Sequence, residues 1–390
     1  MKLLNPIFSG LGTTIFTTMS ELAAEYGAIN LGQGFPDSDG PADLLERAAS
    51  AILTGPNQYP PMAGLPELRK AVAQHNQRFY GLSYDWRDEV LVTSGATEGL
   101  AAAMMALLSP GDEVVVFEPV YDSYLPVIRQ CGAIARIVRL KAPDWRLPEE
   151  ELARAFGPAT KLVLINSPMN PTGKLFEDHE LAAIARLAEH HGAYILSDEV
   201  YEHLVFDGGR HQPIARLPGM RERTLRIGSA GKSFSVTGWK VGYVSGPRKL
   251  ISAVAKVHQF LTFTTPPNLQ HAVAYALTRD DAYFDALATT LAAKRDRLAA
   301  GLRSVGFEVL PARGTYFLTA LADGIGQPFE SDVAYARWLT TDGGVASVPY
   351  SAFYVGASPA EKMIRFCFCK QDEVLDGAIS RLRALLLPTA

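Results

Sequence analysis

Short apolar runs alternate with helical stretches between about residues 90 and 245, and this alternation constrains the possible folds most strongly. We predict strands at 90–93, 113–117, 133–139, 161–166, 193–197 and 224–228, with helices at 98–108, 123–130 and 177–190 between them. The strands are almost wholly apolar, as strands buried on both faces are. The order predicts an α/β fold whose central sheet is mostly parallel and covered by helices on both sides.

The pattern changes after about residue 248. Helices are expected at 249–260, 268–278 and 281–304, followed by short strands near 307–310, 315–319, 345–348 and 363–368, with helices at 332–341 and 372–387. A chain of 390 residues is long enough for two lobes. We predict an N-terminal arm and part of the smaller domain in 1–40, a large ligand-binding domain in 41–280, and a small α+β domain in 281–390. The helix at 281–304 would connect the two.

Composition restricts the classes of partner. The net charge of −4 favours neither nucleic acid nor an anionic membrane. The three cysteines, Cys131, Cys367 and Cys369, cannot all pair within one chain and show no metal-ligand spacing with histidine. Pro6 and Gly10 interrupt any signal-peptide core, and no apolar run is long enough to span a bilayer. We therefore expect a cytoplasmic protein without a metal site, and Cys367 and Cys369 as buried strand residues.

Ligands of open α/β sheets bind beyond the carboxyl ends of the strands. The first predicted strand is followed by Ser94-Gly95-Ala96-Thr97-Glu98-Gly99. Small residues at a helix start can turn backbone N–H groups toward a phosphate, and Thr97 adds a hydroxyl. An ordinary helix cap is the simpler alternative. The segment matches neither the dinucleotide-binding fingerprint nor a Walker loop.

Two further strand ends carry polar side chains. Asn170 lies in Ser167-Pro168-Met169-Asn170-Pro171-Thr172-Gly173, which is either a turn or a source of an amide for a ligand oxygen. Asp198 ends the strand at 193–197, where it could be a buried carboxylate or a helix N-cap. Tyr201 follows three residues later and could lie one helical turn away on the same face.

The last of these strands leads to Ser229-Ala230-Gly231-Lys232, with a second cation at Lys240. Most lysines are solvated surface charges, but a lysine that forms an imine needs a site that lowers its pKa. The four strand ends together offer a phosphate cradle, an amide, a carboxylate with a phenol, and a lysine with a second cation. Pyridoxal 5′-phosphate (PLP) requires this whole set.

At this point the chain resembles the class I/II aminotransferases of PLP fold type I, over nearly its whole length. It is most similar to the kynurenine/glutamine-type and methionine-type branch. The motifs that carry the resemblance are 30–37 (NLGQGFPD), 57–59 (NQY), 170–173 (NPTG), 198–201 (DEVY) and 233–240 (SFSVTGWK).

The resemblance implies a role for each motif. Lys232 would form the aldimine with PLP and then carry the proton at the substrate Cα. Asp198 would keep the pyridine nitrogen protonated, and Asn170 and Tyr201 would hydrogen-bond the ring oxygen. Tyr121, in Pro119-Val120-Tyr121-Asp122-Ser123-Tyr124, would stack on the ring, unless it is a core aromatic. The phosphate would be held by Gly95, Ala96, Thr97, Ser229 and Lys240.

The same resemblance extends to the substrate and to a partner subunit. Arg365 would grip the substrate α-carboxylate, because a guanidinium fork fits a carboxylate bidentately. Gly34 would lie near the substrate, unless it only forms a turn. Tyr59 would reach the phosphate of a partner subunit, which implies a homodimer. Lys240 departs from many relatives, which carry arginine there; it keeps the charge without the bidentate geometry, and we expect PLP still to bind.

Several alternatives remain at this stage. Ser229 to Lys232 matches the S-x-x-K of penicillin-recognising hydrolases, but their other two motifs are missing. A non-enzymatic regulator of this fold would usually carry a fused DNA-binding domain. Within PLP enzymes, transamination by a ping-pong mechanism between an amino acid and a 2-oxo acid is favoured over cysteine-conjugate β-elimination and cyclopropane-carboxylate synthesis. A side-chain pocket around Phe16 and Tyr121, without an obvious second arginine, favours apolar, aromatic, methionine or glutamine donors over aspartate.

Overall fold

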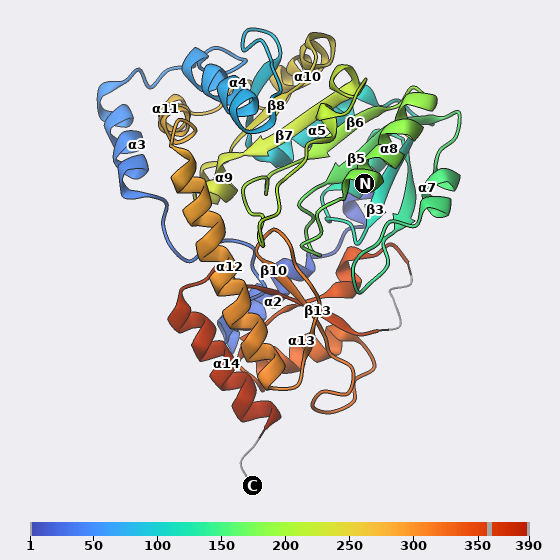
Figure 1. Ribbon diagram of the computed structural model, residues 1–390, viewed down its shortest axis with the longest axis vertical. Coiled ribbons are helices and arrows are strands. Elements are labelled where there is room, and N and C mark those ends of the chain that lie inside the picture. Colours follow the sequence, from blue (N-terminus) through green and yellow to red (C-terminus); the bar gives the residue numbers. More distant parts are fainter. Residues whose placement is uncertain (1, 357–360, 388–390) are drawn as a thin grey trace.

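The computed structural model describes residues 2–356 and 361–387. Its largest sheet has seven strands in the spatial order β2-β8-β7-β6-β5-β3-β4 (Figure 1). Their bounds are β2 (Val90–Ser94), β3 (Glu113–Glu118), β4 (Ile134–Arg139), β5 (Thr160–Asn166), β6 (Tyr194–Asp198), β7 (Thr224–Ser229) and β8 (Val241–Ser245).

The predicted mostly parallel sheet is confirmed, with one antiparallel strand inside it. Strands β7, β6, β5, β3 and β4 run parallel to one another, whereas β8 is antiparallel to both β7 and β2. The prediction did not include β8, which begins directly after Lys240. Because β8 reverses the direction twice, β2 points the same way as β7, and the carboxyl ends of β2, β5, β6 and β7 lie at one edge.

Apart from the edge strand β4, which is largely exposed or half-buried, the strands of this sheet are buried on both faces. In β3, Val114 and Val116 join one apolar cluster, and Val115 and Phe117 join the cluster on the other face. This alternation explains why the sequence reads as continuous apolar runs. The first cluster contains residues of α5 (Gly95–Leu107), α6 (Tyr124–Gln130) and α10 (Arg248–Leu261), and the second contains residues of α7 (Glu149–Ala155) and α8 (Asp178–His190).

Three more helices pack together beside β2 and β8. They are α3 (Ala42–Thr54), α4 (Pro66–Tyr80) and α11 (Pro267–Ala276). Their apolar faces form a third cluster with alternate residues of the two strands. The large sheet is thus covered up to its β2 edge.

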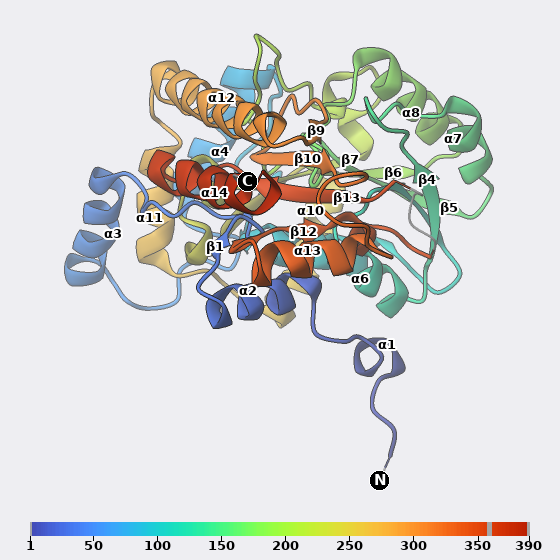
Figure 2. The ribbon, with the colours of Figure 1, turned by 90° about the horizontal axis from the view of Figure 1, so that it is seen from below.

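A second, antiparallel sheet has the order β12-β13-β10-β9. Its strands are β9 (Glu308–Val309), β10 (Phe317–Leu321), β12 (Val348–Pro349) and β13 (Met363–Cys367). Figure 2 shows it between two helical layers, with α12 (Asp281–Ser304) and α14 (Asp372–Leu386) on one face and α2 (Ile15–Glu25) and α13 (Asp332–Thr341) on the other. The predicted long helix is α12, which runs from the end of α11 to this sheet (Figure 1).

Residues 2–40 contain two helices and a short strand. These are α1 (Pro6–Ser9), α2 and β1 (Ile29–Asn30), which pairs with β11 (Val345–Ala346). The segment therefore contacts the part of the chain that holds the second sheet. The domain boundaries at residues 40 and 280 stay a prediction. Among the described residues, no helix has both the length and the apolar character needed to cross a membrane.

Candidate active site

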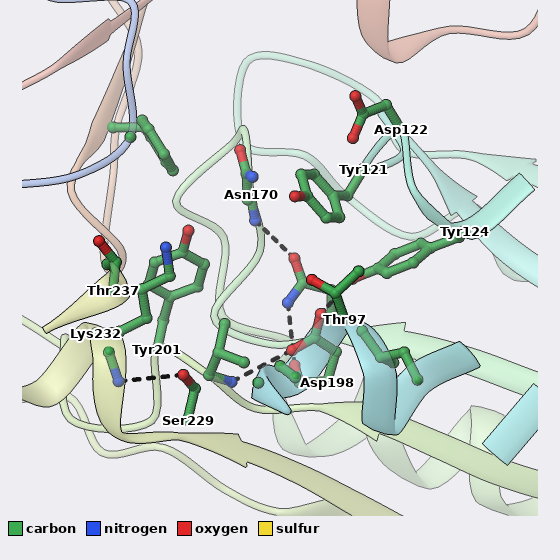
Figure 3. A pocket seen from close by; sticks show the side chains of 18 of the residues that line it. Thr97, Tyr121, Asp122, Tyr124, Asn170, Asp198, Tyr201, Ser229, Lys232 and Thr237 are labelled. Atoms are coloured by element: carbon green, nitrogen blue, oxygen red, sulfur yellow. Dashed lines mark hydrogen bonds between the residues drawn. The ribbon is translucent and has the colours of Figure 1, made fainter. Parts of the chain in front are cut away.

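A cavity of about 350 Å³ lies at the carboxyl edge of the large sheet, where Arg365 and Phe317 of the second sheet also reach it. Figure 3 shows the side chains that converge on it. Every predicted site residue except Tyr59 lines this cavity, namely Gly34, Gly95, Ala96, Thr97, Tyr121, Asn170, Asp198, Tyr201, Ser229, Lys232, Lys240 and Arg365.

One end of the cavity is the start of α5. The helix begins at Gly95, three residues before the predicted start, so the small-residue segment forms its first turn. The φ of Gly95 is +75°, and a Cβ there would lie 3.2 Å from Cε and 3.4 Å from Nζ of Lys240. The first-turn N–H groups of a helix have no partners within it and carry partial positive charge. Together with Lys240 they make this end attractive to an anion.

Two neighbouring elements shape this end. A Cβ on Gly242 would lie 2.5 Å from the carbonyl carbon of Gly95, so β8 and α5 approach each other more closely than any side chain would permit. Ser229 ends β7, and its Oγ accepts a hydrogen bond of 3.2 Å from the N–H of Gly231 at the start of α9 (Ala230–Ser233). Thr97 is exposed and lines the cavity.

Asp198 is a buried carboxylate at the end of β6. Tyr124 Oη donates a hydrogen bond of 2.5 Å to its Oδ2, and the Val200 N–H lies 3.4 Å from its Oδ1. Burial raises the pKa of Asp198 to about 6, although both donors and the Lys232 ammonium act to lower it. Within the described chain it forms no ion pair, so a cationic N–H in the cavity would find an unpaired acceptor.

Two asparagines connect the ends of neighbouring strands. Asn166, the last residue of β5, donates from Nδ2 to the Asp198 carbonyl over 3.0 Å, and its Oδ1 accepts from the Asn170 N–H over 2.8 Å. Asn170 is thereby fixed beside Asp198. Its Oδ1 accepts a hydrogen bond of 2.8 Å from Arg365 Nη1, which leaves its Nδ2 as the donor of the amide.

Arg365 lies on β13 and is 1% exposed. Its Nη2 donates to the Gly32 carbonyl over 2.8 Å, and its guanidinium lies 3.9 Å from the Phe317 ring centroid. Burial lowers its pKa. Its Nε is buried and has no hydrogen-bond partner in the part of the chain described. A buried guanidinium with an unused donor is suited to a carboxylate ligand.

Lys232 is half-buried on α9. Its Nζ donates a hydrogen bond of 2.9 Å to Tyr316 Oη, which donates in turn over 2.5 Å to the Gly34 carbonyl. Burial lowers the pKa of Lys232, so a larger fraction of the side chain is the neutral amine than in solution. A neutral amine is the nucleophilic form that attacks a carbonyl.

The aromatic residues surround Lys232 and Asp198. Burial raises the pKa of Tyr121 to about 12, so it is a neutral phenol, and its ring packs edge-on to Tyr124 at 5.5 Å. Tyr201 is buried, and its ring centroid lies 5.3 Å from that of Tyr316. The expectation that Tyr201 lies one helical turn from Asp198 is wrong, because residues 200–203 form turns instead of a helix. Both nevertheless line the cavity.

Tyr59 is the predicted residue that the cavity does not include. It is 82% exposed, and its ring meets Phe263 edge-on at 5.4 Å. Its position on the outside of the chain is compatible with a contact to another molecule.

Sequence reasoning missed several residues around the cavity. Tyr124 lies close to Tyr121 in the sequence and Asn166 at a predicted strand end, but the local sequence indicates a role for neither. Tyr316 had no local signal, because its contact with Lys232 joins residues 84 positions apart. Other lining residues without a predicted role are Gln33, Leu100, Asp122, Val200, Gly231, Thr237 and Phe317.

Comparisons with known proteins identify the family of the chain. A family model described as "Aminotransferase class I and II" matches residues 26–382. The chain is 47% identical to the "Probable N-succinyldiaminopimelate aminotransferase DapC" of Mycobacterium tuberculosis, over 96% of each chain. It is 42% identical to the methionine aminotransferase of Escherichia coli, over 96% of each chain. It is 38% identical to the kynurenine–oxoglutarate transaminase of Dictyostelium discoideum, over 97% of this chain and 95% of that one.

Solved structures give the same result. The N-succinyldiaminopimelate aminotransferase of M. tuberculosis superposes with a TM-score of 0.95 at 46% identity, over 98% of this chain and all of that one. YbdL of E. coli, whose structure is described with a methionine aminotransferase function, gives 0.94 at 41% identity, over 99% of this chain and all of that one. The chain therefore belongs to the class I and II aminotransferases and is a PLP-dependent transaminase of fold type I.

Proposed function

We propose that Lys232, Asp198 and Arg365 form the centre of the transaminase site, with Lys232 as the residue that binds the cofactor aldehyde. The observation that carries this proposal is that the three groups line one cavity. The cavity combines the Lys232 amine, whose pKa is lowered, with two buried groups that lack a partner among the described residues: the Asp198 carboxylate has no ion-pair partner, and Nε of the Arg365 guanidinium has no acceptor. Each is costly to bury without a ligand that uses it.

The residues fit PLP. The turn at Gly95 leaves little room for a side chain, since a Cβ there would lie 3.2 Å from Lys240 Cε. Gly95, Ala96, Thr97, Ser229 and Lys240 would hold the phosphate, and Tyr121 would stack on the ring. Asn170 Nδ2 and Tyr201 Oη would donate to the ring oxygen. Bound there, PLP supplies an aldehyde that condenses with amines and a ring that accepts the electron pair released at the substrate Cα.

Three protein groups, on Asp198, Lys232 and Tyr316, have separate roles in the reaction. Asp198 would hold the ring nitrogen in its protonated form, and the burial of the carboxylate would strengthen this ion pair. Lys232 Nζ takes the proton from the substrate Cα and returns a proton to the product side, acting as general base and acid. Tyr316 Oη, 2.9 Å from Nζ, orients the amine between these transfers.

We propose apolar or aromatic amino acids, methionine, glutamine or kynurenine as donors. Arg365 would bind the α-carboxylate and the Gly34 backbone would lie beside it. The rings of Phe16, Tyr121 and Phe317 line the cavity, and Arg365 is the sole arginine among the described residues that do so. A side-chain carboxylate would find no second guanidinium. Two reported relatives are named for methionine and kynurenine, which supports the proposal.

The reaction would follow a ping-pong course, with the 2-oxo acid binding the same arginine after the first product leaves. The relatives reported in the previous section are all named as aminotransferases or transaminases, so we retain transamination over β-elimination.

We also propose a homodimer in which Tyr59 reaches the partner's phosphate. A cytoplasmic location is supported by three cysteines that are all free in the described chain.

The test is a donor panel followed by visible absorbance of the holoprotein. Phenylalanine, methionine, glutamine, kynurenine, N-succinyl-diaminopimelate and aspartate are each added without an oxo acid, and the loss of cofactor absorbance is timed. We expect the uncharged donors to react faster than aspartate. Equal or faster reaction with aspartate would reject the proposed substrate class. Failure of every donor would reject the proposed site.

A further inference from the structure

A buried histidine supports the turn at which the phosphate is proposed to bind. His258 of α10 is completely buried, and its Nδ1 lies 3.1 Å from each carboxylate oxygen of Glu98. Glu98 is in the first turn of α5, directly after Thr97, and its Oε2 accepts a hydrogen bond of 3.0 Å from the Ser94 N–H. The carboxylate thus ties the last residue of β2 to the helix that follows, and His258 holds the carboxylate.

The other ring nitrogen of His258 contacts a different segment. Its Nε2 lies 3.2 Å from the carbonyl oxygen of Met62. Met62 is in the loop that carries Tyr59, and this loop also bonds to β2 through the Val92 N–H and the Ala63 carbonyl at 3.0 Å. One ring therefore joins the phosphate turn to the loop that would serve the partner subunit.

The two ring nitrogens of His258 face acceptors of different kinds. The Glu98 carboxylate and the Met62 carbonyl are both acceptors, so His258 completes both hydrogen bonds only as the imidazolium. The Thr262 hydroxyl, 3.2 Å from Nδ1, can accept as well. A cationic ring compensates Glu98, whose uncompensated charge in the first turn of α5 would repel a dianionic phosphate.

We propose that His258 is a positioning residue for the cofactor phosphate. It neutralises Glu98 and fixes the Ser94–Thr97 turn, so that the N–H groups of the turn face an anion without a competing negative charge. His258 itself does not touch the cofactor. The inference rests on the phosphate site proposed above at Gly95, Thr97 and Lys240.

The experiment compares two ligands that differ only in the phosphate. Dissociation constants of PLP and of pyridoxal are measured for apoprotein by absorbance titration. His258→Gln keeps a donor near Met62 but loses the charge and the donor to Glu98. We expect it to weaken PLP by about tenfold or more, the usual loss for a charge-assisted contact, and pyridoxal by less than about threefold.

A second variant separates charge from packing. If repulsion by Glu98 causes the loss, Glu98→Gln added to His258→Gln should restore PLP affinity to within about threefold of the original protein, because glutamine still accepts from Ser94. His258→Asn, which can keep a donor near Glu98 without the charge, should weaken PLP less than His258→Gln does. The matched control is His75→Gln, a buried histidine of α4 paired with His203 at 2.6 Å, which should change neither dissociation constant.

The results distinguish this inference from the proposed site itself. Equal weakening of PLP and pyridoxal by His258→Gln, or no recovery in the double variant, would overturn the positioning role. Lys240→Ala tests the site: if it weakens PLP selectively while His258→Gln does not, the site stands and the role of His258 is wrong. If Lys240→Ala leaves the preference for PLP over pyridoxal unchanged, the proposed phosphate site fails first.

Discussion

Arg365 Nη1 donates a hydrogen bond of 2.8 Å to Asn170 Oδ1, across 195 positions of sequence. Arginine has no acceptor, so this contact determines which end of the Asn170 amide faces Arg365. The Nδ2 end is left as a donor for a ligand in the cavity. The proposed carboxylate-binding residue and a proposed cofactor-binding residue are therefore one hydrogen-bonded unit, which joins the second sheet to the first.

Arg365→Lys should test the guanidinium geometry at constant charge. We expect kcat/KM for a good amino donor to fall on the order of a hundredfold. A lysine cannot make the hydrogen bonds to Asn170 and Gly32 and at the same time bind a carboxylate bidentately. Reaction with phenethylamine, which lacks a carboxylate, should change little. An equal loss for phenylalanine and phenethylamine would show that Arg365 acts on the fold and not on the carboxylate.

Asp198→Asn should stabilise the apoprotein in a pH-dependent way. Burial raises the pKa of Asp198 from 3.8 to about 6, so the ionised carboxylate is less favourable in the folded than in the unfolded chain. This penalty, at most about 3 kcal/mol, is fully present above about pH 6 and disappears as the pH falls toward 4. Urea unfolding at pH 8 and pH 5 should show a stability gain for Asp198→Asn that is larger at pH 8.

Asp198→Asn should also lower the turnover of the holoprotein. An amide cannot hold the protonated ring nitrogen by charge, so turnover should fall by orders of magnitude while the apoprotein is more stable. A stability difference that is the same at both pH values would contradict the raised pKa. Near-normal turnover would contradict the proposed role of the carboxylate.

Tyr124→Phe should weaken the binding of PLP. It removes the 2.5 Å hydrogen bond that favours ionised Asp198, so the pKa of Asp198 should rise further and the ring nitrogen should be held less firmly. We expect about a tenfold higher dissociation constant, measured by absorbance titration of apoprotein. Tyr335→Phe is a matched control, because Tyr335 is equally buried but its hydroxyl has no partner in the described structure. Similar effects of the two changes would refute the prediction.

Co-expression of two defective chains should test the shared site. A dimer of Lys232→Ala with Tyr59→Ala has one site that lacks both residues and one that has both, if Tyr59 serves the partner. Random pairing makes half of the dimers hybrids, so about a quarter of the sites should be intact. Activity at low PLP should then exceed that of either variant alone. If Tyr59 serves its own subunit, mixing should produce no gain.

Much of the candidate site could be predicted because the fold places the carboxyl ends of several strands next to one another. Lys232, Asp198 and Asn170 each follow an apolar run that becomes a strand of the large sheet, and parallel strands end at the same edge. At each strand end, a few neighbouring residues indicate the chemical role of the side chain. The predicted residues lie together because of the sheet topology: parallel strands bring the short segments that follow them to the same side of the sheet.

The rest required information that local sequence does not carry. Strand β8 lies between β7 and β2, and nothing in Val-Gly-Tyr-Val-Ser distinguishes an inserted antiparallel strand from the end of a turn. Tyr316 reaches Lys232 from a segment before β10, and Tyr124 reaches Asp198 from the start of α6. These contacts depend on how the two sheets and their helices pack, which periodicity cannot specify.

The central claim is that Lys232 binds the cofactor, and borohydride reduction of the holoprotein tests it most directly. Reduction makes the bond between cofactor and lysine permanent, and peptide mass spectrometry then locates it. We predict a phosphopyridoxyl group on the peptide that contains Lys232, and its absence from the same peptide of Lys232→Ala. A label on Lys240 or another lysine, with Lys232 unmodified, would contradict the account.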